Sequence, residues 1–310
     1  MASDFLIGHN LHIVIPGDFM SIELLRFEQW VFENEVVIRL SSFLTIFALM
    51  AVWEMLSPRR ALSVSKSIRW LNNVALVVLN SIVLRLLFPA AAVGLAAFVS
   101  ESQWGILNYY QVPHWPAILI SVVVMDFFIY LQHIMVHAIP VLWRLHRVHH
   151  ADLDFDVSTG LRFHPLEIIL SMLIKFAIIL VLGPPVLAVV IFEVILNGMA
   201  MFNHSNIKLP LGFERILRWV LVTPDMHRVH HSIDDEETNS NFGFNLSLWD
   251  RIFGTYCQQP EAGHEGMTIG IRDFRGIGQV GWLWGILLMP FRGKITGYTI
   301  NKRRWLKKSN

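Results

Sequence analysis

Three short histidine motifs in the sequence have the spacing of metal ligands. His133 and His137 form an HxxxH pair, and two HxxHH boxes follow at residues 146–150 and 227–231. Ten of the 14 histidines in the chain lie between residues 133 and 231. Because helix residues three and four apart share a face, each motif directs two or three imidazoles at one place. Neutral imidazole binds zinc, copper, iron and nickel, so the motifs predict a metal site.

The number of imidazoles indicates two metal ions rather than one. Structural zinc takes four protein ligands and catalytic zinc takes three, which is fewer than the motifs offer. Histidines that merely pack in a core are the alternative, but burying so many imidazoles without partners is costly. The residue types alone do not decide which of these metals is bound. The eight predicted ligands are His133, His137, His146, His149, His150, His227, His230 and His231.

Two more histidines flank a long apolar stretch at residues 166–200. His164 lies just before this stretch and His204 lies just after it. A helical hairpin over the stretch would bring both histidines to the side of the membrane where the boxes lie. Each is therefore a candidate further ligand, and a structural hydrogen-bonding role is the alternative for each.

Asp126 and Tyr130 share a helix face with the HxxxH pair. The spacing from Asp126 through Tyr130 and His133 to His137 is four, three and four residues, which places all four on one side of a helix. A carboxylate within a membrane span usually faces the interior of the bundle. We expect both residues to lie behind the metal ligands, where Asp126 would orient an imidazole. A carboxylate that faces other polar groups is the alternative.

Four apolar stretches predict an all-α, polytopic integral membrane protein; they cover residues 37–56, 73–99, 116–137 and 166–200. Arg85 and Pro89 lie inside the second stretch, which predicts either a broken span or an arginine that reaches toward one membrane face. The fourth stretch has Gly183-Pro184-Pro185 at its centre and predicts a helical hairpin. We therefore expect about four transmembrane helices, including this hairpin, and a histidine-rich helical cap.

The charge distribution predicts the orientation of the chain in the membrane. Residues 1–36 carry six acids and one base, whereas residues 57–72 and 292–308 carry bases and no acid. By the positive-inside rule, the two basic segments and the cap lie in the cytosol. The predicted regions are an amino-terminal membrane region at 1–115, a histidine-box catalytic region at 116–256, and a cytosolic basic tail at 257–310 with an interfacial helix near 281–291.

The composition excludes several classes of protein. Apolar residues make up 54% of the 310 residues and charged residues 16%, against about 25% charged residues in ordinary soluble domains. This balance excludes a disordered chain, a coiled coil and a nucleic-acid binder of the basic-patch kind. A single cysteine, Cys257, excludes a disulfide framework and a thiolate metal cluster within one chain.

The histidine region resembles the fatty acid hydroxylase / sterol desaturase superfamily of membrane di-iron oxygenases. The resemblance covers about residues 116–256. It rests on the HxxxH pair and on four segments in this order: LWRLHRVHH at 142–150, TGLRFHPLE at 159–167, DMHRVHHS at 225–232 and LWDRIFGTY at 248–256. One departure is NSNFG at 239–243, where the family pattern has an acidic residue and a Tyr-Gly pair, and this departure bears on substrate detail.

The resemblance implies two iron ions, molecular oxygen as co-substrate and a C–H bond of a lipid as the target. It implies the eight box histidines as ligands, and it places His204, and less directly His164, where the family tends to have further histidines. Iron fits this target better than zinc, because an unactivated C–H bond needs a strong oxidant and zinc has no redox chemistry. Hydroxylation is the predicted reaction. Desaturation by the same site is the alternative, since both reactions begin with the same hydrogen abstraction.

The electrons for this reaction are expected from a separate protein. The sequence has no Gly-rich dinucleotide fingerprint, haem module or cysteine-ligated cluster. We therefore predict a cytochrome b5-like or ferredoxin-like donor on the basic cytosolic face. The compartment is expected to be a bacterial inner membrane or the endoplasmic reticulum, with the site facing the cytosol.

A membrane metal-binding or transport protein is the main alternative of another class. Transport sites usually lie near the bilayer midplane in discontinuous helices, whereas the boxes here lie just beyond the apolar stretches. A bis-histidine haem protein would need isolated histidines on facing helices rather than boxes. The metal content separates these possibilities from a di-iron oxygenase.

Overall fold

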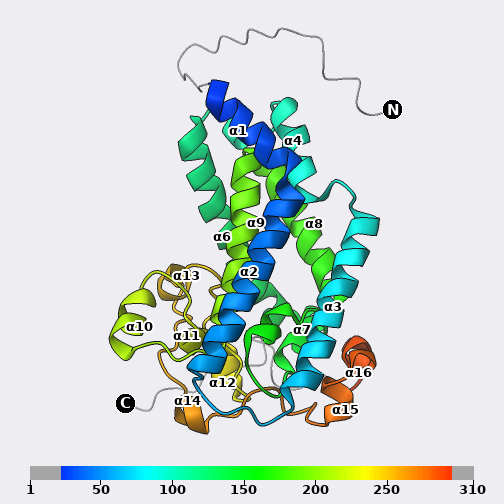
Figure 1. Cartoon of the computed structure of the whole chain (residues 1–310), viewed down its shortest axis with the longest axis vertical. Helices are drawn as coiled ribbons and strands as arrows, with labels where there is room; N and C mark the ends of the chain where they lie inside the picture. The colour runs from blue at the N-terminus through cyan, green and yellow to red at the C-terminus, as the bar shows by residue number, and fades with distance from the viewer. Residues whose placement is uncertain (1–21, 295–310) are drawn as a thin grey trace.

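The long helices stand side by side as a bundle, and the short helices gather at one end as a cap (Figure 1). The computed structural model describes residues 22–294. The bundle contains α1 (Ile22–Glu33), α2 (Glu35–Leu56), α3 (Lys66–Leu87), α4 (Ala91–Glu101), α5 (Ile106–Tyr109), α6 (His114–Ala138), α8 (Pro165–Leu182) and α9 (Val186–Asn203). Over the described range no strand is formed, and three isolated bridges join loops. The all-α prediction is confirmed.

The cap consists of short helices and the loops between them. It contains α7 (Pro140–His150), η1 (Val157–Leu161), α10 (Leu211–Leu217), α11 (Pro224–His230), α12 (Asp235–Thr238), α13 (Leu248–Ile252), α14 (Gly263–Gly266), α15 (Ile277–Val280), α16 (Leu283–Leu288) and η2 (Met289–Phe291). The predicted interfacial helix at 281–291 is α16 followed by η2. The predicted tail beyond residue 294 lies outside the described residues.

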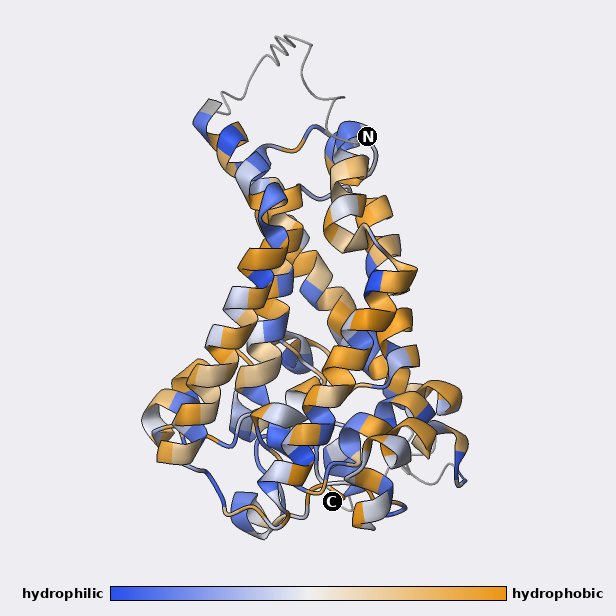
Figure 2. Ribbon diagram, turned by 45° about the vertical axis from the view of Figure 1, so that its right-hand side comes forward, coloured by the Kyte–Doolittle hydropathy of each residue, from blue (hydrophilic) through white to orange (hydrophobic). Residues whose placement is uncertain are grey.

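Five helical segments of the described chain are long and apolar enough to cross a membrane. They are α2, α6, α8, α9 and the stretch Lys66–Tyr109 that contains α3, α4 and α5. Figure 2 shows hydrophobic residues along the bundle and a mixture of hydrophobic and hydrophilic residues in the cap. The structure is therefore that of a polytopic membrane protein. Each half of the predicted hairpin forms a separate 18-residue helix that qualifies, so the number of segments is five.

Two glycines allow the close approaches that shape this bundle. Gly183 joins α8 to α9 with φ at 71°, and a Cβ there would lie 2.4 Å from the Trp104 carbonyl oxygen. Gly160 in η1 lies against the end of α9, where a Cβ would lie 2.5 Å from the Ala200 carbonyl oxygen. A side chain at either position would push these segments apart.

The predicted second apolar stretch is broken, as Arg85 and Pro89 indicated. Helix α3 ends at Leu87, and α4 begins at Ala91 with φ at 51°. The Arg85 guanidinium is exposed and donates to the Pro89 carbonyl oxygen at 3.2 Å.

A buried carboxylate ties three bundle helices together. Glu193 of α9 is 2% exposed. Its carboxylate accepts a hydrogen bond from Lys175 of α8 at 2.6 Å and lies 2.9 Å from Nε of Arg39 of α2. Ionisable groups inside a membrane span are expensive unless they are paired. The three helices are thus held by a charge cluster, in which pairing of Glu193 with Lys175 and Arg39 offsets the free energy that burying each charge costs.

A second buried network fixes the cap to the start of α3. Arg69 contacts Asp152 through two nitrogens at 2.7 and 2.8 Å and contacts Asp156 at 2.5 Å. Arg162, which follows η1, donates to the carbonyl oxygen of Val148 in the last turn of α7 at 2.7 Å. The loop between α7 and η1 directly follows the histidines at the end of α7, and the network therefore fixes where that helix ends.

We expect Arg69→Met to lower the free energy of unfolding by about 3–5 kcal/mol, because it removes the cation that is hydrogen-bonded to two buried carboxylates. Arg272→Met is the matched control. Arg272 pairs with Asp234 and Asp235 at the surface, and such exposed pairs are worth at most about 1 kcal/mol. Thermal unfolding of both variants in detergent, followed by circular dichroism, makes the comparison. Equal midpoints for the two variants would contradict the structural role of Arg69.

Candidate metal centre

Nine buried histidines come together in the cap as two adjacent groups. In each group, one ring nitrogen from every histidine lies within 4.8 Å of the corresponding nitrogens of the others. The five-histidine group contains His133, His137, His146, His150 and His230. The four-histidine group contains His149, His204, His227 and His231. All eight histidines of the predicted motifs are brought together, and His204 joins them.

Each HxxHH box is divided between the two groups. On α7 the first and last histidines of the box belong to the five-histidine group, and His149 belongs to the four-histidine group. On α11 and its cap residue the assignment is reversed, and only His230 belongs to the five-histidine group. The sequence indicated that each box converges on one place. The structure shows instead that each box links both groups, which places the groups side by side.

The ring nitrogens of neighbouring histidines face one another at short range. Nε2 of His150 lies 3.2 Å from Nε2 of His137 and 3.2 Å from Nε2 of His146. Nε2 of His204 lies 3.0 Å from Nε2 of His149 and 3.0 Å from Nε2 of His227. In each case one Nε2 faces two others, and a single Nε2–H can donate to only one of them, whereas a cation among the three nitrogens satisfies all of them.

Several other ring nitrogens in the two groups have no hydrogen-bond partner among the described residues. They are Nε2 of His133 and His230, both ring nitrogens of His231, and Nδ1 of His149 and His227. Buried polar atoms normally have a partner. These unpartnered atoms lie among donors of the kind that transition metals prefer. The residues present therefore fit a metal ion in each group.

Burial keeps these imidazoles in the neutral form that binds metal. The pKa values of four rings lie far below the ordinary value of 6.5; the rings are those of His149, His150, His227 and His231. The main cause is desolvation by burial, and repulsion from neighbouring histidines adds to it. Burial also lowers the pKa of His204 and of His230 to about 3. At neutral pH the lone pairs of these rings are thus available to a metal.

Oxygen acceptors behind the rings determine which nitrogen faces the centre. In His133, Nδ1 lies 2.8 Å from the Phe242 carbonyl oxygen. In His230, Nδ1 lies 2.7 Å from the Ser240 carbonyl oxygen. In His146 it lies 2.6 Å from a carboxylate oxygen of Glu167. A carbonyl or carboxylate oxygen can only accept, so Nδ1–H donates and Nε2 is left as the ligand atom.

Glu167 was not predicted as a partner of histidine. It stands in the first turn of α8 and is buried, with its carboxylate against His146 of α7. The two residues are far apart in the sequence, and only the packing of α7 against α8 brings them together. The available signal was the single acidic residue in the segment at 159–167 that carries the family resemblance.

The loop at residues 239–250 is the second element whose contacts with the imidazoles were not predicted from the sequence. Its carbonyl and amide oxygens contact three rings of the five-histidine group, at His133, His137 and His230. Asp250 holds this loop, since it accepts from the backbone N–H groups of Phe242 and Gly243 at 2.7 Å each.

Asp126 and Tyr130 form hydrogen bonds with residues of the cap and not with an imidazole. Asp126 accepts hydrogen bonds from the backbone of residues 245 and 246 and from Nε1 of Trp249 at 2.8 Å. Tyr130 forms a hydrogen bond of 3.0 Å with the Thr255 hydroxyl. The shared helix face is correct, but Asp126 lies seven residues before His133, about 10 Å along the helix axis. Both residues therefore hold the loop segments rather than an imidazole.

His164 lies outside both histidine groups. Pro165 begins α8, and His164 caps this helix through Nδ1, which accepts from the backbone N–H of Leu166 at 3.2 Å. Its Nε2 lies 3.3 Å from the Leu287 carbonyl oxygen. Both ring nitrogens are therefore occupied by protein groups.

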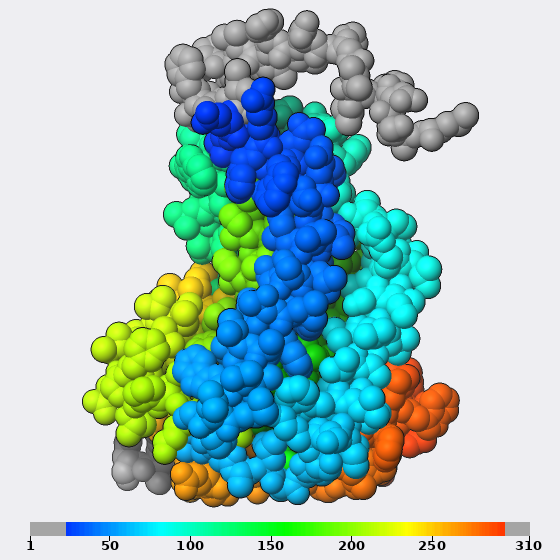
Figure 3. All heavy atoms as spheres, in the orientation of Figure 1, coloured from blue at the N-terminus to red at the C-terminus, as the bar shows by residue number. Residues whose placement is uncertain are grey.

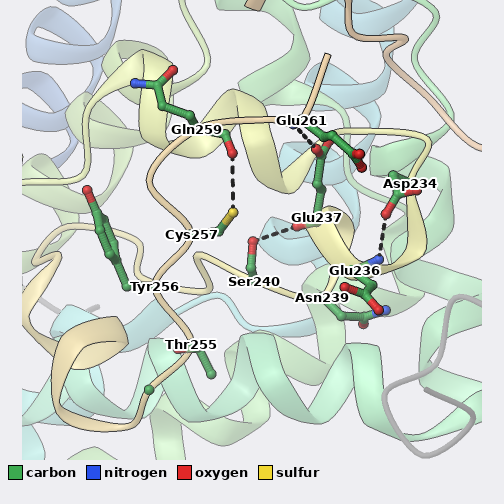
Figure 4. Close-up of a pocket in the computed structure, with 11 residues that line it drawn as sticks. Asp234, Glu236, Glu237, Asn239, Ser240, Thr255, Tyr256, Cys257, Gln259 and Glu261 are labelled. Atoms are coloured by element: carbon green, nitrogen blue, oxygen red, sulfur yellow. Dashed lines mark hydrogen bonds between the residues drawn. The ribbon is translucent and has the colours of Figure 1, made fainter. Parts of the chain in front are cut away.

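A polar pocket of about 350 Å³ lies beside the five-histidine group (Figure 4). Asn239 and Ser240 line it, and the same two residues contact His137 and His230. Four carboxylates also line the pocket; they belong to Asp234, Glu236, Glu237 and Glu261. This lining is too polar to receive an acyl chain.

Comparison with known proteins agrees with this geometry. The sequence profile of the fatty acid hydroxylase family matches residues 118–255. Ornithine lipid hydroxylase OlsE of Rhizobium tropici is 26% identical over 227 residues, which are 70% of this chain and 66% of that protein. The alkylglycerol monooxygenase of Homo sapiens is 33% identical over 49% of this chain and 33% of that protein. The alkylglycerol monooxygenase of Xenopus tropicalis is 32% identical over 48% of this chain and 32% of that protein.

These matches concern part of each relative. The chain spans just under two thirds of the ornithine lipid hydroxylase and about a third of these alkylglycerol monooxygenases. No solved structure matches the chain. The matched region at 118–255 contains all nine clustered histidines. The region that holds these histidines is therefore similar to the fatty acid hydroxylase family.

Proposed function

We propose that this protein is a membrane-bound oxygenase that hydroxylates a C–H bond of a lipid, with molecular oxygen as co-substrate and two iron ions as cofactor. The observation that carries the proposal is the pair of buried histidine groups, each with ring nitrogens converging on a common centre. The two kinds of relative support a lipid substrate, because one is a hydroxylase of ornithine lipid and the other a monooxygenase of alkylglycerol.

The residues proposed to hold the metal are the nine clustered histidines, one ion to each group. Bound iron would supply the activation of molecular oxygen that an unactivated C–H bond requires. The chain itself supplies the ligand geometry and a site from which bulk water is excluded. Oxygen acceptors such as Glu167 and the Phe242 carbonyl hold the rings so that each Nε2 faces the centre.

We infer that the five-histidine group binds its ion more tightly than the four-histidine group. In the five-histidine group, every Nδ1 has an oxygen within 3.4 Å. In the four-histidine group, only Nδ1 of His204 has one, from the Ala200 carbonyl at 2.7 Å, and the other three have no partner among the described residues. Such outer partners typically change metal affinity 10–100-fold, and the five-histidine group also offers one more ligand.

The proposal extends to the setting of the enzyme. The cap would face the cytosol of a bacterial cell or the cytosolic side of the endoplasmic reticulum, as the basic connector between α2 and α3 indicates. A separate cytochrome b5-like or ferredoxin-like protein would supply electrons at this face.

We expect purified protein reconstituted with Fe²⁺ to hold two iron ions per chain and to release them in two phases against a chelator. His231→Ala should remove the weakly held ion and His230→Ala the tightly held one. His164→Ala is the control and should keep both ions, because His164 lies outside both groups. Iron content by mass spectrometry gives the result. Loss of both ions in His164→Ala, at unchanged thermal stability, would contradict the assignment.

We expect Glu167→Ala to weaken the tighter site about 10–100-fold, because Nδ1 of His146 loses its acceptor. Glu167→Gln keeps an oxygen at this position and should cost much less. Chelator competition on both variants measures the difference. Equal affinities in the two variants would mean that Glu167 does not act through His146.

We expect the iron-loaded protein, with a reductant and ¹⁸O₂, to add one ¹⁸O atom to a lipid of a membrane extract. His227→Ala should abolish this addition, since it removes a ligand of the four-histidine group. Mass spectrometry of the lipids makes the test. A product that has lost two hydrogens and gained no oxygen would show desaturation instead.

A further inference from the structure

Two segments of the cap expose large apolar side chains. They come from residues 211–220, which contain α10, and from residues 248–253, which contain α13; we call these two segments the cap lobe. The exposed side chains are those of Leu211, Phe213, Ile216, Trp219, Val220, Leu248, Ile252 and Phe253, each between 45% and 76% exposed. Figure 3 shows the α10 segment standing out at the side of the molecule. Water is a poor solvent for such a surface.

The cap lobe is one packed unit and not two independent loops. The backbone N–H of Ser247 donates to the Val220 carbonyl oxygen at 3.1 Å, and the Ser247 hydroxyl donates to the Arg218 carbonyl oxygen at 2.7 Å. The Arg251 guanidinium lies over the Trp219 ring at 4.1 Å. These contacts join the two segments, so their apolar side chains present one surface.

The cap lobe packs against the membrane-spanning helix α6 and not beyond its end. The ring centroid of Phe127 lies 4.9 Å from that of Trp249 and 5.9 Å from that of Phe253. Phe127 stands 11 residues before the end of α6 at Ala138, about 16 Å along the helix axis. At this level α6 itself exposes Phe128 and Leu131, each 38% exposed. The apolar surface of the lobe thus continues the apolar surface of the span.

We propose that the cap lobe is inserted in the lipid leaflet on the cap side of the bilayer. Its occupant is the acyl-chain and headgroup region of that leaflet, because the lobe lies beside an apolar span and exposes apolar side chains at the same level. Trp219 and the Arg251 that stacks on it have the amphipathic character typical of the interface. Arg215 is exposed on α10 and is available to lipid headgroups.

Spin labels at single cysteines test this inference in vesicles. Cys257 is the single cysteine of the chain, so Cys257→Ser provides the background. The full-length, metal-loaded protein carries a nitroxide at Ile216→Cys or Phe213→Cys in phosphatidylcholine/phosphatidylglycerol vesicles. Leu44→Cys on α2 is the lipid reference, and Glu236→Cys on α12 is the water reference; both positions are exposed. Power saturation compares oxygen, which concentrates in lipid, with a water-soluble nickel chelate.

The lobe labels are expected to behave like the label at Leu44, with oxygen accessibility above nickel accessibility. The label at Glu236 should show the reverse. Nickel accessibility at residues 213 and 216 equal to that at Glu236 would place the lobe in water and overturn the proposal. Exclusion of both reagents at the lobe, relieved by diluting the protein in lipid, would show a second copy of the chain as the occupant and would also overturn it. Retained iron content in each variant verifies that the fold is intact.

Discussion

Nine imidazoles are buried side by side at the cap end of the bundle, and the facing nitrogens of several neighbours lie 3.0–3.2 Å apart. Such an arrangement is unfavourable for neutral rings alone, because one N–H can donate to only one of the two nitrogens that it faces and the other stays buried without a partner. It becomes favourable when a cation lies between them. The remainder of the cap is best understood as the support that holds these rings in place against that cost.

The supports differ between the two histidine groups and come from distant parts of the chain. Glu167 of α8 and the loop at 239–250 serve the five-histidine group, and Asp250 in turn holds that loop. The buried Arg69 network fixes the loop that follows α7. Charged pairs inside the bundle, such as that of Glu193 with Lys175, keep the long helices in register. The asymmetry of support is the basis for two sites of unequal affinity.

The spacing of histidines on helices predicted that the eight histidines of the three motifs come together, because the i, i+3 and i+4 rule is local. The same rule placed Asp126 on the correct face of α6 but could not reveal that a loop from residues 239–250 fills the space behind His133. Glu167 and the division of each box between two groups depend on how α7, α8 and α11 pack, which no local pattern encodes. His164 resembled a ligand in sequence, yet Pro165 makes it a helix cap.

The cap lobe places lipid close to this centre, since Phe253 packs on Tyr130 one turn of α6 before His133. Each histidine group is proposed to hold one metal ion, and anomalous diffraction at the iron edge from crystals of the iron-loaded protein would locate these ions. We expect two peaks, one among His133, His137, His146, His150 and His230 and one among His149, His204, His227 and His231. A single peak, or a peak at His164, would contradict this proposal.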